Sequence, residues 1–526
     1  MRKISDKKII NEQYKQYLTD ESRLEGKVVA NLYFPQSSED VVSVVNEVSS
    51  SREALVISSG RTGIVGGAVP CGVRNLISLE EVVGDIFIGY DEEWFARVPA
   101  GISLETFNNY LQKGKYKYLP NQSLPLSKPN KLFYPVNPTE ATARIGGTVA
   151  TNASGSRSFF YGATRNWVRR IKVVLANGTM LNLRRGENRA KAGILSLEDN
   201  ISITVSDINM PTVKNTAGYY LSSDVDAIDL FIGGEGTLGI ITEVDIRLIS
   251  RPKNMLGQII FFKEKKQLLE FLMSIISPSE SDFKPVALEY FDNNSLNLLR
   301  QRREEEGSSS LIVNIPDSVE YALYVENTFE DDDELESLFN IFDQLLKDVG
   351  SSAEDSWAGF DEKTIEQMTI FRHAVPEAIN SIIGQRKASF PEIRKISSDM
   401  AVPPDKIEHI LEVYDAILAS SNLEYVIFGH IGDGHVHVNI LPQNADEIES
   451  GYKLFNIFAR EVVACGGSVS AEHGIGRLKK EFLAVQYPKE TIELMKNIKR
   501  TLDEKNLLNP GVLFDMLKNN NLSIVL

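Results

Sequence analysis

The hydrophobic and polar positions in the first half of the chain predict many short helices and strands. Valines 41, 44, 45 and 48 share one face of a helix expected over 35–48, which Ser37 or Ser38 can cap. An apolar run over 54–57 predicts a buried strand, and Asn177-Gly178 predicts a hairpin turn. Further strands are expected at 75–88, 95–98, 171–176, 180–183 and 244–249, with a short helix over 103–111. This alternation is typical of an α+β or α/β domain.

The pattern changes after Arg251-Pro252, where we place a domain boundary. A strand from 258, a helix over 266–276 and further strand and helix pairs predict a second α+β domain. Strands are expected at 425–428 and 435–441. The tail from 488 is expected to be helical until Asn509-Pro510-Gly511 stops it.

Composition narrows the possible functions. A chain of 526 residues is too long for one ordinary core, so at least two domains are expected. The net charge of −16 disfavours nucleic acid as a partner. Two cysteines, Cys71 and Cys465, cannot supply the four thiolates of an iron–sulfur cluster. Neither a secretory signal nor an apolar run long enough to cross a membrane is recognisable, so a cytoplasmic enzyme is expected.

Three blocks rich in glycine lie in the first domain, over 58–68, 145–155 and 231–242. Such loops let a backbone with free N–H groups approach a pyrophosphate closely, so they predict a large phosphorylated cofactor. No block is a Gly-x-Gly-x-x-Gly fingerprint at a strand-to-helix turn, and none is a P-loop. A Rossmann nicotinamide enzyme and a P-loop NTPase are therefore both disfavoured.

Four of the six histidines lie in two short stretches, 429–439 and 471–476. His430 and His437 flank a Gly-Asp-Gly turn that can bring their imidazoles together, and Glu472 offers an oxygen ligand. Three ligands with open positions indicate a catalytic divalent metal, for which zinc, manganese and iron(II) are all suitable. The isolated His373 and His409 are interpreted as structural.

In order and spacing, the motifs resemble those of the FAD-linked oxidases. The matching segments are 59–70, 134–155, 233–242, 429–439, 472–476 and Asn509-Pro510-Gly511. That family includes D-lactate dehydrogenases, glycolate oxidase flavoprotein subunits and D-2-hydroxyglutarate dehydrogenases. The resemblance implies an α+β protein with an N-terminal extension (1–26), an FAD-binding domain of the p-cresol methylhydroxylase (PCMH) type (27–252), and a ferredoxin-like C-terminal cap domain (253–526). The last helices are expected to return to the FAD domain.

The resemblance also implies how FAD is held. The pyrophosphate would contact Ser59, Gly60, Arg61, Thr62 and Gly63. The rest of the cofactor would be lined by Gly66, Gly147, Asn152, Gly155, Gly239 and Ile241. The first domain contains no histidine that could carry the flavin covalently, so noncovalent FAD is expected.

For the reaction centre, the resemblance favours zinc or manganese on His430, His437 and Glu472. Glycines 474 and 476 let His473 bend into the same site and act as the base. Arg372 is the candidate for the substrate carboxylate, and Asn439 for a hydrogen bond to the substrate. Many relatives carry asparagine where this chain has His435, which leaves open whether His435 is an extra ligand or a partner of the ligands.

The implied activity is oxidation of a D-2-hydroxy acid to the 2-oxo acid, with hydride transfer to flavin N5. Ser397 stands where hydroxyglutarate-specific relatives have a lysine, which favours D-lactate or glycolate. Two alternatives remain: a transferase like alkyl-dihydroxyacetone-phosphate synthase, and a noncatalytic FAD subunit of a glycolate oxidase complex.

The expected partners follow from that activity. The electrons must leave to a separate acceptor, which is a quinone, an electron-transferring flavoprotein or an iron–sulfur subunit. A homodimer and peripheral attachment to the inner membrane are compatible with the resemblance.

Overall fold

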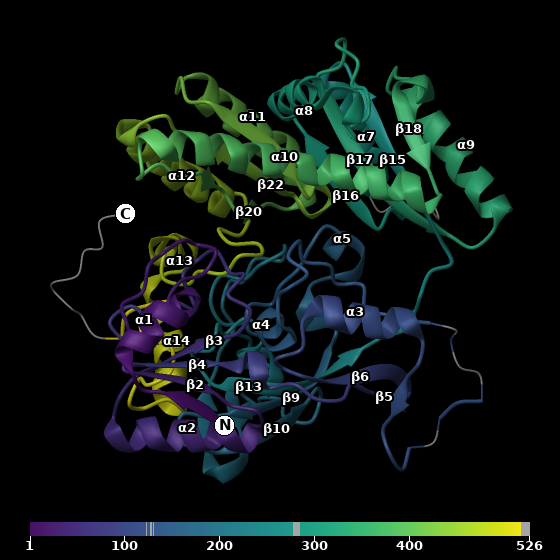
Figure 1. Ribbon diagram of the computed structural model, residues 1–526. Coiled ribbons are helices and arrows are strands. Elements are labelled where there is room, and N and C mark those ends of the chain that lie inside the picture. Colours follow the sequence, from purple (N-terminus) through teal and green to yellow (C-terminus); the bar gives the residue numbers. More distant parts are fainter. Residues whose placement is uncertain (123, 127–128, 130, 277–283, 517–526) are drawn as a thin grey trace.

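The computed structural model describes residues 1–122, 124–126, 129, 131–276 and 284–516. Two domains lie one above the other in Figure 1, with the N-terminus in the lower one. Among these residues, no helix combines the length and apolar character needed to cross a membrane.

Two sheets form the lower domain. The smaller has the order β1 (Arg2–Ile4), β2 (Asn31–Phe34), β4 (Asn75–Ser78) and β3 (Leu55–Ser58), in which β4 is parallel to both β2 and β3. The larger has the order β10 (Met180–Arg184), β9 (Val168–Val174), β13 (Ile240–Arg247), β6 (Glu93–Pro99), β5 (Phe87–Asp91) and β7 (Lys117–Tyr118). Two short pairs join β8 (Leu132–Phe133) to β14 (Ile249–Ser250) and β11 (Ile194–Ser196) to β12 (Ser202–Thr204).

Among the described residues, the first half of the chain contributes six α-helices to this domain. They are α1 (Lys7–Gln13), α2 (Ser38–Ser51), α3 (Leu104–Lys113), α4 (Ile145–Ala150), α5 (Ser158–Tyr161) and α6 (Ala227–Phe231). Ser37, one of the two predicted capping residues, caps helix α2, because its side chain accepts a hydrogen bond from the Asp40 N–H. The helix therefore begins at Ser38, three residues later than predicted, and it continues to Ser51. Its four valines are all buried, and they pack with Leu55 and Ile77 of the small sheet.

The upper domain is built on an eight-stranded sheet. Seven strands run in the order β18 (Ser356–Gly359), β15 (Asn254–Phe262), β17 (Tyr321–Phe329), β16 (Ala287–Phe291), β21 (Tyr425–Gly429), β22 (His435–Ile440) and β19 (Ile396–Ser397), while β20 (Met400–Ala401) also pairs with β22. All these pairings are antiparallel. The helices are α7 (Lys265–Ile276), α8 (Asn293–Glu306), α9 (Asp332–Asp348), α10 (Glu362–Ser389), α11 (Ile407–Ala419) and α12 (Ala445–Ala464).

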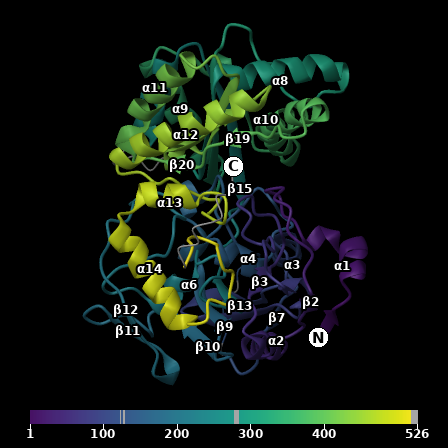
Figure 2. The ribbon, with the colours of Figure 1, turned by 90° about the vertical axis from the view of Figure 1, so that its left-hand side faces the viewer.

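The chain then returns to the lower domain, where α13 (Lys480–Gln486) and α14 (Lys489–Leu502) run down one side (Figure 2). The Leu55 N–H donates to the Leu507 carbonyl at 2.7 Å, and the Asn509 N–H donates to the Leu55 carbonyl at 3.0 Å. The tail helix is shorter than predicted and ends at Leu502. The reason is Asp503, whose carboxylate accepts the N–H groups of Leu507 and Leu508 and so turns the chain.

Polar contacts join the two domains directly. Arg157 of the lower domain binds Glu326 of β17 at 2.8 Å, and the Ser158 hydroxyl donates to Asp433 at 2.6 Å. Both arginine and glutamate are largely buried, so this ion pair is well shielded from solvent.

Candidate active site at the domain interface

The turn between β21 and β22 brings the first histidine stretch into one cluster. His430 precedes a short 3₁₀ turn over Ile431–Asp433, and Gly434 then reverses the chain with φ 63°. A Cβ at Gly434 would lie 2.0 Å from the Val402 carbonyl oxygen, so only glycine fits. The rings of His430 and His437 are consequently 5.7 Å apart, and those of His435 and His437 are 4.4 Å apart.

Glu472 reaches this cluster from the loop between α12 and α13. Its Oε1 lies 3.2 Å from His430 Nε2 and 4.0 Å from His435 Nδ1. One ligand atom each from His430, His435, His437 and Glu472 fall within 4.8 Å of one another. Ligands about 2.1 Å from a shared ion lie roughly 3–4 Å apart, so the donor set fits a divalent metal after small side-chain movements.

Two of the histidines have their second ring nitrogen already engaged. His430 Nδ1 pairs with Glu289 Oε1 at 2.7 Å, and His437 Nδ1 pairs with the Ser398 carbonyl at 3.0 Å. Since these oxygens can only accept, both Nδ1 atoms carry a proton, and Nε2 is the atom of each ring that is left to bind a metal. Metal-bound histidines are usually oriented in this way.

The surroundings of His430 and His437 shift the pKa values of the two rings in opposite directions. Burial opposes a charge on His430, but the carboxylates of Glu289 and Glu472 outweigh it and raise its pKa to about 9. Burial, together with the neighbouring His430 and His473, lowers the pKa of His437 to about 4. Burial also opposes ionisation of Glu289, yet Arg372 and His430 lower its pKa to about 2. In this cluster, ionised carboxylates therefore lie next to imidazole rings.

Asp399 shapes the loop that carries Glu472 and His473. Its buried carboxylate accepts the N–H groups of both residues at 3.0 Å, and it also binds Ser470 and Lys479. His473 Nδ1 lies 3.5 Å from Asp399 Oδ2. The His473 ring is nearly parallel to that of His437, with centroids 5.7 Å apart.

His473 differs from His430 in its protonation state, because the pKa of His473 is lowered and that of His430 is raised. Burial lowers its pKa to about 4 even though Asp399 favours the charged form. The ring is therefore neutral at pH 7 and able to accept a proton. Its side chain keeps 22% of its surface exposed, against 7% for His430 and none for His435.

Arg372 on α10 lies beside the cluster. Its Nε is 3.0 Å from Glu289 Oε1, so one glutamate joins this arginine to His430. A small pocket of about 150 Å³ lies between the domains here, lined by Asn137, Pro138, Thr139, Ser156, Arg157, Tyr324, Glu326, Thr369, Arg372 and His373. Asn439 is buried on β22 and uses its amide to donate to the His437 carbonyl at 3.1 Å.

The first two glycine-rich blocks lie against each other. A Cβ at Gly147 would contact Ser59 at 3.5 Å, and one at Gly60 would lie 3.2 Å from the Arg144 nitrogen. The Ser59 hydroxyl is buried without a hydrogen-bond partner among the described residues, which suits a bound ligand. Gly63 has open space around it, and Thr62 is half-buried.

Other predicted FAD residues already have partners within the protein. The Arg61 guanidinium pairs with Glu80 at 3.3 Å and stacks on the Tyr17 ring. Asn152 accepts the Arg165 N–H at 2.9 Å. The remaining positions have structural explanations. Gly66 adopts a left-handed φ of 73°, and Ile241 is buried in β13. Gly155 packs closely against the Asn137 carbonyl, and Gly239 packs closely against Val173.

Two residues of the cluster were not predicted from the sequence. Lys214, whose side chain is 5% exposed, contacts Glu472 Oε1 closely and lies 3.5 Å from Asp433 Oδ2. Nothing in the sequence around Lys214 distinguishes it. Glu289 did leave a signal, because it is the single charge in the otherwise buried and uncharged strand β16.

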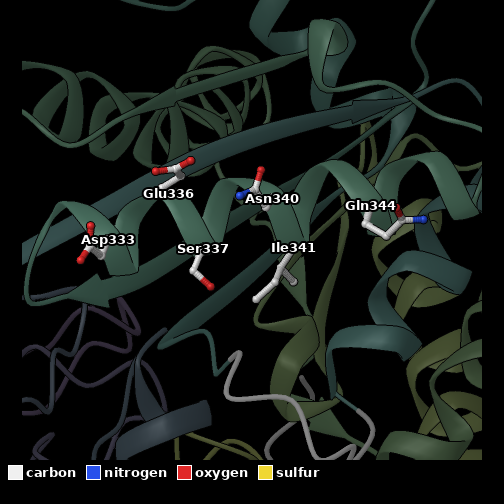
Figure 3. A pocket seen from close by; sticks show the side chains of 6 residues that line it. All are labelled: Asp333, Glu336, Ser337, Asn340, Ile341 and Gln344. Atoms are coloured by element: carbon white, nitrogen blue, oxygen red, sulfur yellow. The ribbon is translucent and has the colours of Figure 1, made fainter.

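A shallow hollow of about 450 Å³ lies elsewhere, along one face of α9 (Figure 3). Among the described residues, its lining comes from that helix: Asp333, Glu336, Ser337, Asn340, Ile341 and Gln344. Helix α9 packs on α7 toward the β18 side of the sheet, whereas the histidines lie on β22 near the opposite edge. The hollow therefore takes no part in the histidine site.

Sequence comparison defines the class of protein to which this two-domain architecture belongs. The family model "FAD binding domain" matches residues 29–184, and "FAD linked oxidases, C-terminal domain" matches residues 259–513. The chain belongs to the FAD-linked oxidases, which confirms the predicted family, the predicted fold and an FAD-dependent oxidoreductase.

Among individual proteins, the chain is similar to a D-lactate dehydrogenase of Anaerostipes hadrus, with 28% identity covering 97% of this chain and 95% of that protein. It is 28% identical to a D-2-hydroxyglutarate dehydrogenase of Xanthomonas citri pv. viticola, over 91% and 88% of the two chains. It is 25% identical to a glycolate oxidase subunit of Bacillus subtilis, over 91% and 88%. A solved alkyldihydroxyacetonephosphate synthase superposes with TM-score 0.60 and 15% identity, covering 93% of this chain and 77% of that one, which shows a shared fold.

Proposed function

We propose that this protein is an FAD-dependent dehydrogenase that oxidises a D-2-hydroxy acid to the 2-oxo acid. The observation that carries the proposal is the convergence of His430, His437 and Glu472, with the neutral His473 beside them, at the interface of the two domains. When bound, FAD would supply a two-electron acceptor at N5 and a divalent metal would supply a Lewis acid.

The residues of the chain have separate roles in this proposal. His430, His437 and Glu472 hold the metal, and His473 takes the proton of the substrate hydroxyl, with Asp399 behind its Nδ1. Arg372 binds the substrate carboxylate with the guanidinium nitrogens that Glu289 leaves free. Asn439 stabilises β22 through its bond to His437, and its proposed contact with the substrate is secondary.

The cofactor proposal rests on the lower domain. The loop over 59–63 and the block around Gly147 form adjacent walls in which the buried Ser59 hydroxyl lacks a partner. Noncovalent FAD is proposed along these walls, lined further by the glycines and by Asn152 and Ile241. We propose that residues 1–26 form an N-terminal extension, residues 27–252 the FAD-binding domain and residues 253–526 the C-terminal cap domain.

D-Lactate and glycolate are the proposed substrates. Ser397 stands on the short strand β19 and donates weakly to the Ser398 carbonyl, so this position offers no cation to a second substrate carboxylate. Relatives named for D-lactate and glycolate oxidation support this choice, although others are named for D-2-hydroxyglutarate. The reduced flavin would pass its electrons to a separate quinone, electron-transferring flavoprotein or iron–sulfur partner.

The test is anaerobic mixing of the FAD-loaded protein with D-lactate, L-lactate or glycolate while the flavin absorbance is followed. D-Lactate or glycolate should bleach the flavin, prior chelation should slow bleaching strongly, and His473→Asn should slow it about 10²- to 10⁴-fold without loss of FAD or metal. A flavin that stays oxidised with both D-lactate and glycolate would exclude the proposed reaction. Bleaching at the same rate with and without chelator would exclude a role for the metal in the reaction.

A further inference from the structure

His435 has an environment that the proposed three-ligand site does not explain. Its side chain is completely buried, yet neither ring nitrogen makes a hydrogen bond with any residue that the structure describes. At least one nitrogen of a buried imidazole normally makes a hydrogen bond. Two ring nitrogens without a hydrogen bond therefore indicate that a partner is missing.

The orientation of the ring indicates where that partner belongs. Nδ1 lies 4.0 Å from Glu472 Oε1, and the ring centroid lies 5.4 Å from that of His430 and 4.4 Å from that of His437. The other ring nitrogen, Nε2, lies 3.3 Å from Asp399 Oδ1. A small movement of the ring would let Nε2–H donate to Asp399, which leaves the Nδ1 lone pair directed into the cluster.

The geometry points to His435 as a fourth protein ligand, so that three imidazoles and one carboxylate hold the metal through His430, His435, His437 and Glu472. This inference rests on the proposed function, because it takes the metal of that same site as given. The distances are compatible with one ion, since a ligand atom from each of the four residues lies within 4.8 Å of the others.

A fourth ligand restricts which ion can be catalytic. Zinc usually takes four ligands, so four protein donors would complete its shell and leave no position for a substrate. Manganese(II) is commonly six-coordinate, so the same four donors would leave two positions open. The site is therefore assigned to a six-coordinate ion of the manganese(II) type, not to zinc.

The first experiment needs no variant. The full-length FAD-loaded protein is stripped with a chelator and reloaded with manganese(II), and pulsed electron paramagnetic resonance counts the coordinated histidine nitrogens. Three imidazole nitrogens are expected. A count of two would overturn the inference and leave the three-ligand site intact.

The second experiment measures manganese(II) affinity by calorimetry. His435→Asn should bind manganese(II) at least about ten-fold more weakly than the wild type, because an imidazole nitrogen is replaced by a poorer amide donor. His409→Asn is the matched control, since His409 is exposed on α11 and should leave the affinity unchanged. Equal affinity of His435→Asn and wild type would overturn the fourth ligand.

A third variant separates this inference from the proposed function. His430→Ala should abolish tight manganese(II) binding whether three or four residues hold the ion. If His430→Ala weakens binding and His435→Asn does not, only the fourth ligand is wrong. If neither variant changes the affinity, the metal centre of the proposed function is wrong as well.

Discussion

Glu289 is a single buried carboxylate that serves two functional residues. Its Oε1 contacts both Arg372 Nε at 3.0 Å and His430 Nδ1 at 2.7 Å. It thereby fixes the tautomer of a proposed metal ligand and the position of the proposed substrate arginine. Outer partners of this kind commonly affect metal affinity as much as 10- to 100-fold.

We therefore expect Glu289→Gln to weaken metal binding about 10- to 100-fold. The measurement is calorimetric titration of metal into protein from which a chelator has removed the bound metal. Glu326→Gln is the matched control, because Glu326 is also buried and paired with an arginine, on the adjacent strand β17. Among the described residues, Glu326 forms no ion pair or hydrogen bond with a histidine. Equal metal affinities of the two variants would contradict the role of Glu289.

At the scale of elements, the turn between β21 and β22 decides whether the histidines meet. Gly434→Ala should destabilise the apoprotein by about 2–3 kcal/mol, since it combines a left-handed φ with a Cβ only 2.0 Å from the Val402 carbonyl oxygen. Gly466→Ala, with φ 79° but open space around it, should lose only about 1 kcal/mol. Urea unfolding measures both, and a smaller loss for Gly434→Ala would contradict this account.

Helix α8 provides a test of pH dependence. Asp292 caps it by accepting the Ser295 N–H at 2.8 Å, and burial raises the pKa of this carboxyl from 3.8 to about 7. In the pH range between these values the unfolded chain loses a proton that the folded chain keeps. The stability contributed by this group is therefore complete below about pH 4 and is lost as the pH rises to 7.

Asp292→Asn keeps the capping oxygen and removes the titration. Relative to this variant, the wild type should lose up to about 4 kcal/mol of unfolding free energy between pH 4 and 7. Denaturant unfolding of both proteins across this range is the measurement. Parallel pH profiles would show that Asp292 does not titrate as described.

The elements that could be predicted from the sequence are those with local determinants. Helix α2 was recognisable from its valines and its capping serine, β21 from its apolar run and β22 from its alternation. The approach of His430 and His437 was predicted because a Gly-Asp-Gly turn lies between them. Lys214 escaped prediction because its partner Glu472 is 258 positions away, a separation that no local pattern reports. For Glu289, the local pattern marks a buried charge but does not identify its partner His430, 141 positions away.

At the scale of the whole molecule, Lys214 connects the lower domain to the cluster. Its ammonium contacts Glu472 and lies near Asp433, so it balances their charges without a metal. Lys214→Met should leave these buried carboxylates unpaired and lower the melting temperature of the apoprotein. Bound metal would then restore the balance.

We therefore expect metal addition to raise the melting temperature more in Lys214→Met than in the wild type, as measured by calorimetry with and without chelator. Lys265→Met is the control, because it removes a lysine–aspartate pair with Asp415 that lies outside the cluster. A metal-induced shift no larger than that of the wild type would contradict the proposed role of Lys214.

The return of the chain to β3 has a consequence for biosynthesis. The Ile57 N–H donates to the Asn509 side chain at 2.8 Å, across 452 positions of sequence. The ribosome synthesises β3 long before Asn509. The edge of β3 therefore stays exposed during most of translation. Chaperones that protect exposed strand edges should therefore engage the nascent polypeptide until its final segment emerges.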